Sequence, residues 1–319
     1  MDWENILRRF EFIPINKLGQ GSFGCVYLAY HNDYGIIAVK IYEKEKYEEN
    51  EIEAAIRIGS GSNIGGQEMK NIFMLRIIGS KVKDQYPKII TEYANMKTLE
   101  IIAQQIQLHL PTFTLRALML QMRVDIKLEN ILLHSPPGSG RVYAKISDYG
   151  FTQLLGYSMT KRRDVTNDPT QLKGSRPYMA PELFQGQVKL TQKIDVYALG
   201  VTFYVMIVHR FPLNQPTFQE QKRKLAQMNA ITRPQEIKDD LLWNLLSKML
   251  EFDPEKRITS DEAMHHPYFT GPQAIADFSP EQLQLVQQAK QAKEIGDKSI
   301  TEYDMDPYFT VAESEIKKI

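Results

Sequence analysis

The first ninety residues alternate short apolar runs with turn-forming residues, a pattern typical of β-strands. Cys25–Ala29 and Ile36–Ile41 are apolar runs separated by His31-Asn32-Asp33-Tyr34-Gly35, so together they predict an antiparallel hairpin. Glu45–Ile58 is rich in Glu and Lys, with apolar residues at helical spacing, and predicts a helix before a Gly/Ser loop at 59–66. Two further runs are predicted as strands: Ile72–Ile78 and Lys88–Glu92.

Helical periodicity dominates from Leu99 onward, apart from strand-like pieces at Ile131–Leu133 and Ala144–Ile146. The longest apolar-rich run, Val196–Val208, is too short for a membrane span and predicts a buried core helix. The chain therefore predicts an α+β fold, with a small β-rich half followed by a larger and mostly helical half.

The segment after Phe269 has its own helix signal. Ser279-Pro280-Glu281-Gln282 is a capping box with proline at the first helical position, and Gly296 is a suitable stop. Four apolar residues lie near helical spacing between them: Leu283, Val286, Ala289 and Ile295. We expect a polar helix that packs loosely or not at all, in preference to a helix that docks a partner or regulator.

Composition narrows the functional classes. The 319 residues carry 39 Lys plus Arg and 39 Asp plus Glu, so the net charge is zero. Nucleic-acid binders of the polybasic kind need an excess of cations to meet phosphates, and no nucleic-acid partner is predicted. A hydrophobic content of 43% is ordinary for a folded protein.

Cysteine usage and the N-terminus bear on location. Cys25 is the single cysteine, so no intrachain disulfide is possible, and a reducing compartment fits. Met1-Asp2-Trp3-Glu4 has an early acid and no apolar run, unlike a signal peptide. We expect a cytoplasmic, soluble protein without a membrane span. The six histidines show no ligand-like spacing to cysteine, which argues against a structural zinc site.

A glycine cluster, Gly19-Gln20-Gly21-Ser22-Phe23-Gly24-Cys25-Val26, could let main-chain N–H groups approach phosphate oxygens. Such a cluster also occurs in dinucleotide-binding folds and in plain turns. In a dinucleotide fold a helix follows the glycines, whereas here Cys25–Ala29 is strand-like. This favours a hairpin flap over a nucleotide.

Three further motifs carry candidate chemistry. In Ala38-Val39-Lys40 the ammonium could reach phosphates, with Glu51 as its partner and Glu53 as the alternative. In Asp125-Ile126-Lys127-Leu128-Glu129-Asn130 the Asp, Lys and Asn could orient a hydroxyl, touch a phosphate and bind a metal. In Ser147-Asp148-Tyr149-Gly150 the carboxylate could hold Mg²⁺. Each motif alone also fits an ordinary polar strand end, loop or turn.

Together and in this order, the motifs resemble the eukaryotic protein kinase family of the serine/threonine type. Four later parts of the chain match further landmarks of that family: Ala180-Pro181-Glu182, Asp195–Val201, Arg257 and His266-Pro267-Tyr268-Phe269. The resemblance covers 12–269 and implies a bilobal kinase-like fold. Its boundaries are an N-terminal extension at 1–11, an N-lobe at about 12–91, a C-lobe at about 95–269 and a tail at 270–319.

The resemblance implies that the cofactors are ATP and Mg²⁺ and that adenine lies between the lobes. Thr91 would be the gatekeeper, and the Glu92 carbonyl and Ala94 amide would bond the adenine edge. Three apolar side chains would enclose the ring: Leu18, Val26 and Ala38. The glycine loop would cover the phosphates through Gly19, Gln20, Gly21, Ser22, Phe23, Gly24 and Cys25.

The resemblance also assigns the polar groups. Lys40, held by Glu51, would bind the α- and β-phosphates, and Asp148 and Asn130 would hold Mg²⁺. Asp125 would orient the acceptor hydroxyl and take its proton, while Lys127 is typical of serine/threonine kinases. The partner is therefore a protein substrate with a Ser or Thr acceptor. Five positions would be structural or regulatory: Thr170 as the phosphosite, Ser175 reaching toward Asp125, Glu182 pairing with Arg257, and Asp195 in the helix that anchors the catalytic loop.

The catalytic region departs from the family pattern. Arg123-Val124-Asp125 stands where the family usually has His-Arg-Asp, so the arginine that receives an activation-loop phosphate is absent. Whether a phosphate on Thr170 has a basic partner is open, with Lys173 and Arg176 as the candidates. Asp125 comes 33 positions after Glu92, about ten fewer than is usual. Leu115–Met122 predicts the helix before the catalytic loop and runs almost directly into Asp125.

These departures leave two main hypotheses. The first is an active Ser/Thr protein kinase, because Lys40, Asp125, Asn130 and Asp148 are all present. The second is a catalytically impaired pseudokinase that acts as a nucleotide-binding scaffold, because a misplacement of about 1 Å can cost on the order of a hundredfold in rate. The first is favoured, since a scaffold has no physical need for all four polar groups. A small-molecule kinase is the weakest of the three readings.

Overall fold

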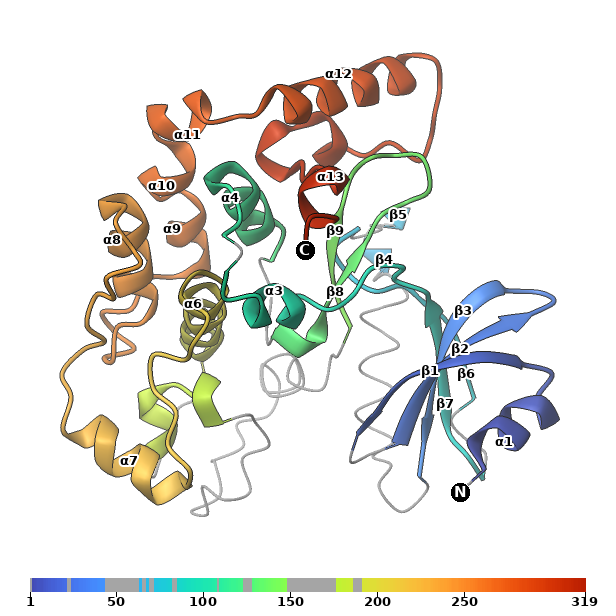
Figure 1. The fold of residues 1–319 in the computed structure, drawn as a ribbon, viewed down its shortest axis with the longest axis horizontal. Coiled ribbons are helices and arrows are strands. Elements are labelled where there is room, and N and C mark those ends of the chain that lie inside the picture. The colour runs from blue at the N-terminus through green and yellow to red at the C-terminus, as the bar shows by residue number, and fades with distance from the viewer. Residues whose placement is uncertain are drawn as a thin grey trace. The chain divides into compact units, whose positions relative to one another are not determined.

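The computed structural model describes residues 2–21, 24–43, 63–64, 67–68, 72–81, 85–107, 109–122, 128–147, 176–185 and 191–319. The chain divides into two compact units. The first comprises Met1–Asn95 with Lys145–Gln153, and the second comprises Met96–Ala144 with Leu154–Ile319. The first unit holds a sheet and the second is mainly helical, so the α+β prediction is confirmed (Figure 1).

A five-stranded antiparallel sheet forms the first unit, in the order β1-β2-β3-β7-β6. The hairpin of β2 and β3 confirms the first prediction, and its turn closes at Gly35 with φ of +68°, a conformation that glycine adopts at little cost. The strands are β1 Ile13–Gly21, β2 Gly24–His31, β3 Gly35–Tyr42, β6 Ile77–Lys81 and β7 Lys88–Glu92. Two short strands, β4 Asn63–Ile64 and β5 Gln67–Glu68, pair with each other, the first of them inside the predicted Gly/Ser loop.

The predicted strand at Ile72–Ile78 begins later than expected, because β6 starts at Ile77. The preceding residues pair with the end of another strand instead: Leu75 donates to the Ile146 carbonyl at 2.9 Å, and Ile146 donates to the Phe73 carbonyl at 3.0 Å. The predicted run therefore contains extended chain, but only its last two residues, Ile77 and Ile78, belong to β6. The helix predicted at Glu45–Ile58 lies outside the described residues.

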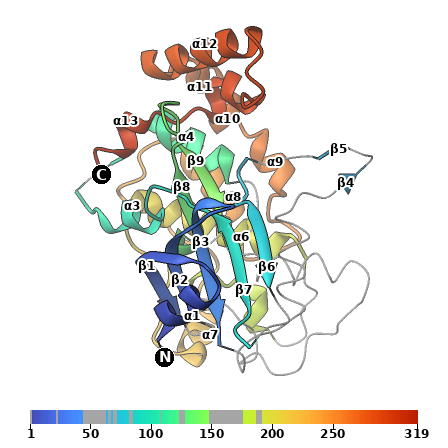
Figure 2. The same ribbon diagram turned by 90° about the vertical axis from the view of Figure 1, so that its right-hand side faces the viewer.

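Helix α1, Trp3–Arg9, covers one face of the sheet (Figure 2). The Asp2 carboxylate caps the helix by accepting the Asn5 N–H at 3.1 Å. Trp3, Ile6 and Leu7 are buried in one apolar cluster with side chains from the central strands: Cys25, Tyr27, Ala29, Ile37, Val39, Ile41 and Ile90. One sheet face is thereby closed by the chain's own N-terminal helix.

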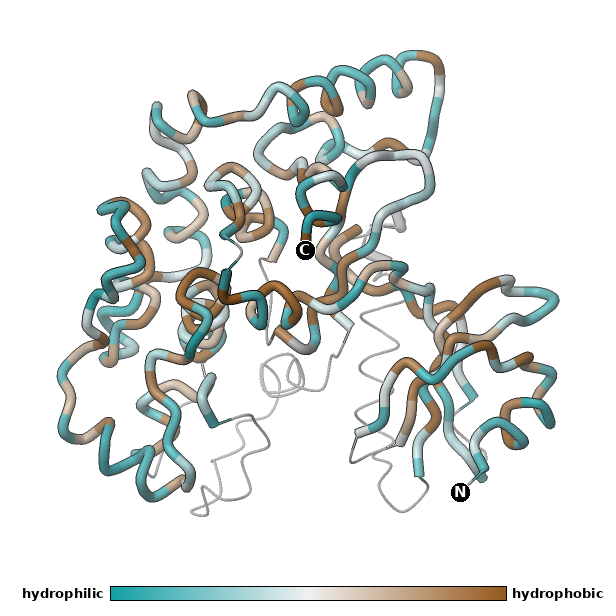
Figure 3. The backbone as a smooth tube through the Cα atoms, in the orientation of Figure 1, coloured by the Kyte–Doolittle hydropathy of each residue, from teal (hydrophilic) through white to brown (hydrophobic). Residues whose placement is uncertain are grey.

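The second unit is built around α6, Lys193–Val208, which is hydrophobic on most sides (Figure 3). A helix that is apolar all round must be buried, and the predicted core helix is confirmed. Gly200 allows a close approach to α8, since a Cβ there would lie 3.0 Å from the Met249 Cβ. Among the described residues of this unit, the other helices before the tail are α3 Glu100–Gln104, α4 Thr112–Gln121, α7 Phe218–Ala226, α8 Asp240–Met249, α9 Ser260–Met264 and α10 Pro267–Thr270. Two short 3-10 turns accompany them: η4 Arg176–Tyr178 and η5 Pro181–Phe184.

The strand-like pieces of the helical half form a separate ladder. Strand β8, Ile131–His134, pairs with β9, Tyr143–Ile146, and the 3-10 turn η2, Leu128–Asn130, leads into β8. Both strands fall where the apolar pattern predicted them. Among the described residues, no helix is long and apolar enough to cross a membrane.

The tail contains the predicted helix, α12 Pro280–Glu294, with both hydrogen bonds of the capping box at Ser279. The prediction of loose packing is wrong. The buried positions are Gln282, Leu285, Val286 and Ala289, whereas Leu283 and Ile295 are 49% and 87% exposed. The buried face of α12 includes Gln282, whose side chain donates to the Thr310 carbonyl at 2.8 Å. Because Gln282 is polar, the apolar pattern of the sequence could not identify it as buried.

The tail then returns along the second unit. The remaining elements are α11 Pro272–Ala276, η6 Tyr303–Met305, η7 Pro307–Phe309 and α13 Glu313–Ile316. Val142 donates to the Val311 carbonyl at 2.9 Å, and Glu313 donates to the Gly140 carbonyl at 2.8 Å, so tail and body pair like neighbouring strands. Val311 and Ala312 are both 1% exposed, and Ile316 of α13 is buried in the main apolar cluster of this unit. The tail's apolar face is thus used by its own unit.

Candidate functional site

The register of the sheet gathers several predicted nucleotide residues on one face. Val26 lies opposite Lys40 across β2 and β3, and Ala38 lies opposite Thr91 across β3 and β7. Opposed residues project to the same face, and Ala38 and Lys40 are two positions apart, so all four share that face. It is the face opposite the one that α1 covers.

The local contacts on this face are those of a partly open surface. Val26, Lys40 and Thr91 are half-buried, and Ala38 is buried. The Thr91 hydroxyl lies 3.5 Å from the Ala38 carbonyl, and Lys40 Nζ lies 5.1 Å from the centre of the Tyr42 ring. Glu51, the expected partner of Lys40, lies outside the described residues.

The glycine cluster is a strand pair, as the sequence predicted, with Gly19 opposite Val26 and Gly21 opposite Gly24. A Cβ on Gly24 would lie 1.9 Å from the Ile41 carbonyl oxygen, so this glycine is required by the close approach of two strands. A Cβ on Gly19 or Gly21 would meet nothing within 4 Å. Within the described part of the chain, no contact demands glycine at those two positions, which leaves their main chain open there to an approaching phosphate. Ser22 and Phe23 lie outside the described residues.

The resemblance implies that Cys25 binds ATP as part of the glycine loop, but its side chain does not lie on the nucleotide face. It is 1% exposed and packs in the cluster with α1. Burial raises the pKa of its thiol to about 11, so it is a weak nucleophile. Only the main chain of Cys25 is available to a nucleotide. Leu18, at 43% exposure, and Gln20 remain exposed on the neighbouring strand.

The end of β7 is anchored by an ion pair that the sequence did not reveal. The Glu92 carboxylate accepts the Arg76 N–H and the Lys145 ammonium, each at 2.8 Å. Lys145 also donates to the Ile72 carbonyl at 3.1 Å, and its side chain is 8% exposed. Glu92 therefore points its carboxylate into the first unit. The available signal was a lone lysine inside an apolar strand. Ala94, two residues later, is buried.

In the second unit, Asn130 is half-buried at the end of η2 and directly precedes β8. Asp195 lies half-buried in the first turn of α6, where the helix dipole favours a carboxylate. Five other predicted site residues lie outside the described residues: Asp125, Lys127, Asp148, Thr170 and Ser175. Their roles stay predictions.

Glu182 and Arg257 form the pair that the family resemblance led us to expect. Their two nitrogen–oxygen contacts are 2.7 and 2.8 Å, and the side chains are 9% and 0% exposed. The guanidinium also donates to the Glu251 carbonyl at 2.8 Å and stacks over Tyr197, whose ring centre lies 5.0 Å away. Burial raises the pKa of Tyr197. The flat fork of arginine suits this bidentate, fully desolvated contact.

Comparisons with known proteins agree with this geometry. A family model described as protein kinase domain matches residues 12–269. The chain is 24% identical to serine/threonine-protein kinase dkf-1 of Caenorhabditis elegans over 298 residues, covering 86% of the chain and 38% of the relative. It is 29% identical to Aurora kinase of Schizosaccharomyces pombe over 271 residues, covering 79% and 69%. It is also 29% identical to the probable serine/threonine-protein kinase CCRP1 of Zea mays over 156 residues, covering 49% and 23%.

The chain spans less than two thirds of the length of several of these relatives, among them the proteins of Zea mays and C. elegans. The family itself is decided by the match over 12–269, which is well over half of the chain. With that match, the five-stranded antiparallel sheet and the mainly helical second unit, this chain belongs to the protein kinase domain family.

Proposed function

We propose that the chain is a serine/threonine protein kinase that transfers the terminal phosphoryl group of ATP to hydroxyl groups of protein substrates. The observation that carries this proposal is the sheet face shared by Val26, Ala38, Lys40 and Thr91, next to a glycine-rich strand pair. One cation among apolar side chains suits a ligand that has an apolar ring and charged phosphates.

The residues of this sheet face, of the glycine-rich strand pair and of the end of β7 then each have a role in nucleotide binding. The side chains of Leu18, Val26 and Ala38 enclose the adenine ring, and the Glu92 carbonyl and Ala94 amide bond its edge. Lys40 meets the α- and β-phosphates as a point charge, while the open main chain at Gly19 and Gly21 approaches them from the glycine loop. The Glu92–Lys145 ion pair keeps the end of β7 in place for the adenine contacts.

The transfer step uses the second set of residues. In this proposal Asp125 orients the substrate hydroxyl and accepts its proton, and Lys127 supplies a positive charge to the phosphoryl group. Asn130 and Asp148 offer the oxygen ligands that Mg²⁺ prefers, so they fit this metal. When bound, Mg²⁺ neutralises charge on the phosphates. Thr170 is the proposed phosphosite, and Ser175 is the proposed hydroxyl of the substrate loop that acts with Asp125 and Lys127.

A radiolabelled ATP assay on a generic protein substrate tests the proposal. Wild type should incorporate phosphate, and Asp125→Asn and Lys40→Met should each lose most of it. Equal incorporation by all three proteins would refute an active kinase. A thermal-shift titration with Mg-ATP then tests the pseudokinase alternative, because a ligand of the native state alone raises Tm. We further propose a cytoplasmic location, in keeping with the single thiol Cys25.

A further inference from the structure

Gln121, the last residue of α4, joins three segments through its side-chain amide. It is 1% exposed. Its Oε1 accepts the Ala144 N–H at 2.6 Å, while its Nε2 donates to the Val142 carbonyl at 3.1 Å and to the Phe309 carbonyl at 2.7 Å. A glutamine amide has two N–H donors and one oxygen, so every polar atom of this side chain has a partner.

Two of these segments lead directly to residues that the proposed function requires. Asp125 follows Gln121 by four positions, and Asp148 follows Ala144 by four positions. Gln121 therefore joins the end of α4 to the start of β9. From each of these two points the chain reaches a proposed catalytic group after four positions, the base in one case and the metal ligand in the other. The connection before Asp125 is about ten residues shorter than is usual for the family, so few residues remain to orient that aspartate by other means.

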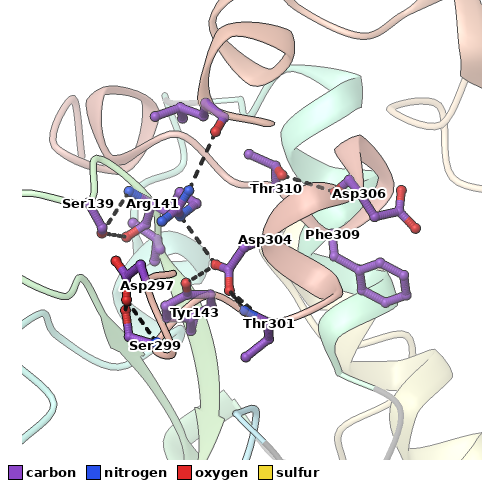
Figure 4. Close-up of polar contacts among 12 residues, drawn as sticks. Ser139, Arg141, Tyr143, Asp297, Ser299, Thr301, Asp304, Asp306, Phe309 and Thr310 are labelled. Atoms are coloured by element: carbon purple, nitrogen blue, oxygen red, sulfur yellow. Dashed lines mark hydrogen bonds and ion pairs between the residues drawn. The ribbon is translucent and has the colours of Figure 1, made fainter. Parts of the chain in front are cut away.

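The third segment is the tail, which makes polar contacts with the start of β9 (Figure 4). The Asp304 carboxylate, 2% exposed, accepts the Thr301 N–H at 2.7 Å and is hydrogen-bonded to the Tyr143 hydroxyl. Arg141 Nε lies 3.2 Å from Asp304 as an ion pair, without the alignment of a hydrogen bond. Together with the backbone pairing of 140–142 to the tail, these contacts leave the start of β9 little freedom to shift.

We propose that Gln121 is a positioning residue for phosphoryl transfer, which it serves by locking the end of α4 to the start of β9, and that the C-terminal tail completes this lock through the Phe309 carbonyl. The proposal rests on the proposed function. Loss of the lock frees the end of α4 and the start of β9, the two points from which the chain leads to Asp125 and Asp148, and about 1 Å of misplacement of a reacting group costs on the order of a hundredfold in rate. Nucleotide affinity should survive, because the residues proposed to bind ATP lie on other elements.

The test compares Gln121→Met with wild type in the full-length chain. Methionine keeps the length and apolar stem and removes all three hydrogen bonds. We expect kcat to fall by about 10- to 100-fold, with KM for ATP and for the protein substrate within about twofold of wild type. The Mg²⁺ concentration for half-maximal activity should rise, whereas ATP affinity measured without Mg²⁺ should stay the same. A merely structural role would not produce that split.

Gln221→Met is the matched control. Gln221, in α7 of the same unit, is 2% exposed, and its side-chain oxygen accepts the Gln215 N–H at 2.9 Å, away from the contacts of Gln121. Gln221→Met should also lower Tm, while keeping kcat within about threefold of wild type. An equal loss of kcat in both variants would overturn the positioning role, because the loss would then follow stability.

Gln121→Glu keeps the test decisive if the methionine variant does not fold. Its carboxyl retains an oxygen for the Ala144 N–H and, since burial favours its protonated form, one donor for a carbonyl. An intermediate kcat is expected, and a kcat within about twofold of wild type would overturn the inference. An inactive wild type, equal to Lys40→Met, would refute the proposed function, whereas an active wild type with unaffected Gln121 variants would refute this inference alone.

Discussion

Breaking the buried ion pair of Glu182 and Arg257 should destabilise the second unit far more than breaking a comparable pair at the surface. Removing one partner of a buried pair leaves an uncompensated charge, which costs about 3–5 kcal/mol. Glu182→Leu and Arg257→Met should each lower the free energy of unfolding by an amount in that range, because the side chains are 9% and 0% exposed and the contact is bidentate. The double variant leaves no lone charge. Its loss of unfolding free energy should therefore be clearly smaller than the sum of the losses in the two single variants.

Arg210 and Glu236 supply the control within the same unit. They form a second bidentate Arg–Glu contact, but their side chains are 56% and 39% exposed. A solvated pair of this kind is worth about 0.2–1 kcal/mol in a double-mutant cycle. The chemistry is the same in both pairs, so the difference between the two coupling energies isolates the effect of burial.

Urea unfolding followed by tryptophan fluorescence measures these free energies. The chain has two tryptophans, Trp3 in α1 of the first unit and Trp243 in α8 of the second. A Trp3→Phe background makes Trp243 report on the second unit alone, which avoids treating a chain of two units as one transition. A coupling energy for Glu182–Arg257 no larger than that for Arg210–Glu236 would refute the reasoning.

Three further outcomes are expected. Gly24→Ala should destabilise the first unit by several kcal/mol, because its Cβ would lie 1.9 Å from a carbonyl oxygen, whereas Gly21→Ala, which meets open space, should change stability by no more than about 1 kcal/mol. Cys25 should react with iodoacetamide at pH 8 at least about a hundredfold more slowly in the native than in the unfolded protein, because its pKa is raised to about 11 and the thiolate is the nucleophile. Burial lowers the pKa of His266 below its ordinary 6.5, so native stability should fall as pH drops below that value, and His266→Asn should flatten the dependence.

The sign of the His266 effect follows from proton binding. Its Nδ1 accepts the Tyr268 N–H at 3.2 Å, and its other ring nitrogen lies 2.9 Å from the Asn244 side-chain oxygen, an arrangement that suits the neutral ring. Below pH 6.5 the unfolded chain binds the proton more readily, so unfolding is favoured, by about 1.4 kcal/mol for each unit of pKa depression. An unchanged slope in His266→Asn, measured by urea unfolding at pH 5 to 8, would contradict this assignment.

Equal losses of stability in Gly24→Ala and Gly21→Ala, measured by the same unfolding assay, would show that the close approach of β2 and β3 is not what requires glycine. Rapid alkylation of Cys25 in the native protein, followed by mass spectrometry, would show that the thiol is not buried beneath α1.

Much of the local structure could be read from the sequence, because it depends on neighbours a few residues apart. The hairpin of β2 and β3, the core helix α6 and the capping box at Ser279 all follow from turn residues, apolar spacing and a side chain that bonds three positions ahead. The motif order likewise led to the family, since it is a property of the chain and not of its packing.

Tertiary structure decided which surfaces meet. Gln282 completes the buried face of α12 because Thr310, 28 positions later, accepts its hydrogen bond. Gln121 depends on Phe309, 188 positions later, and Lys145 on Glu92, 53 positions earlier. When a polar side chain and its partner lie far apart in the sequence, the sequence pattern predicts an exposed side chain, because periodicity reflects only near neighbours. Burying such a group is costly until the distant partner satisfies it, and only the folded chain brings that partner into contact.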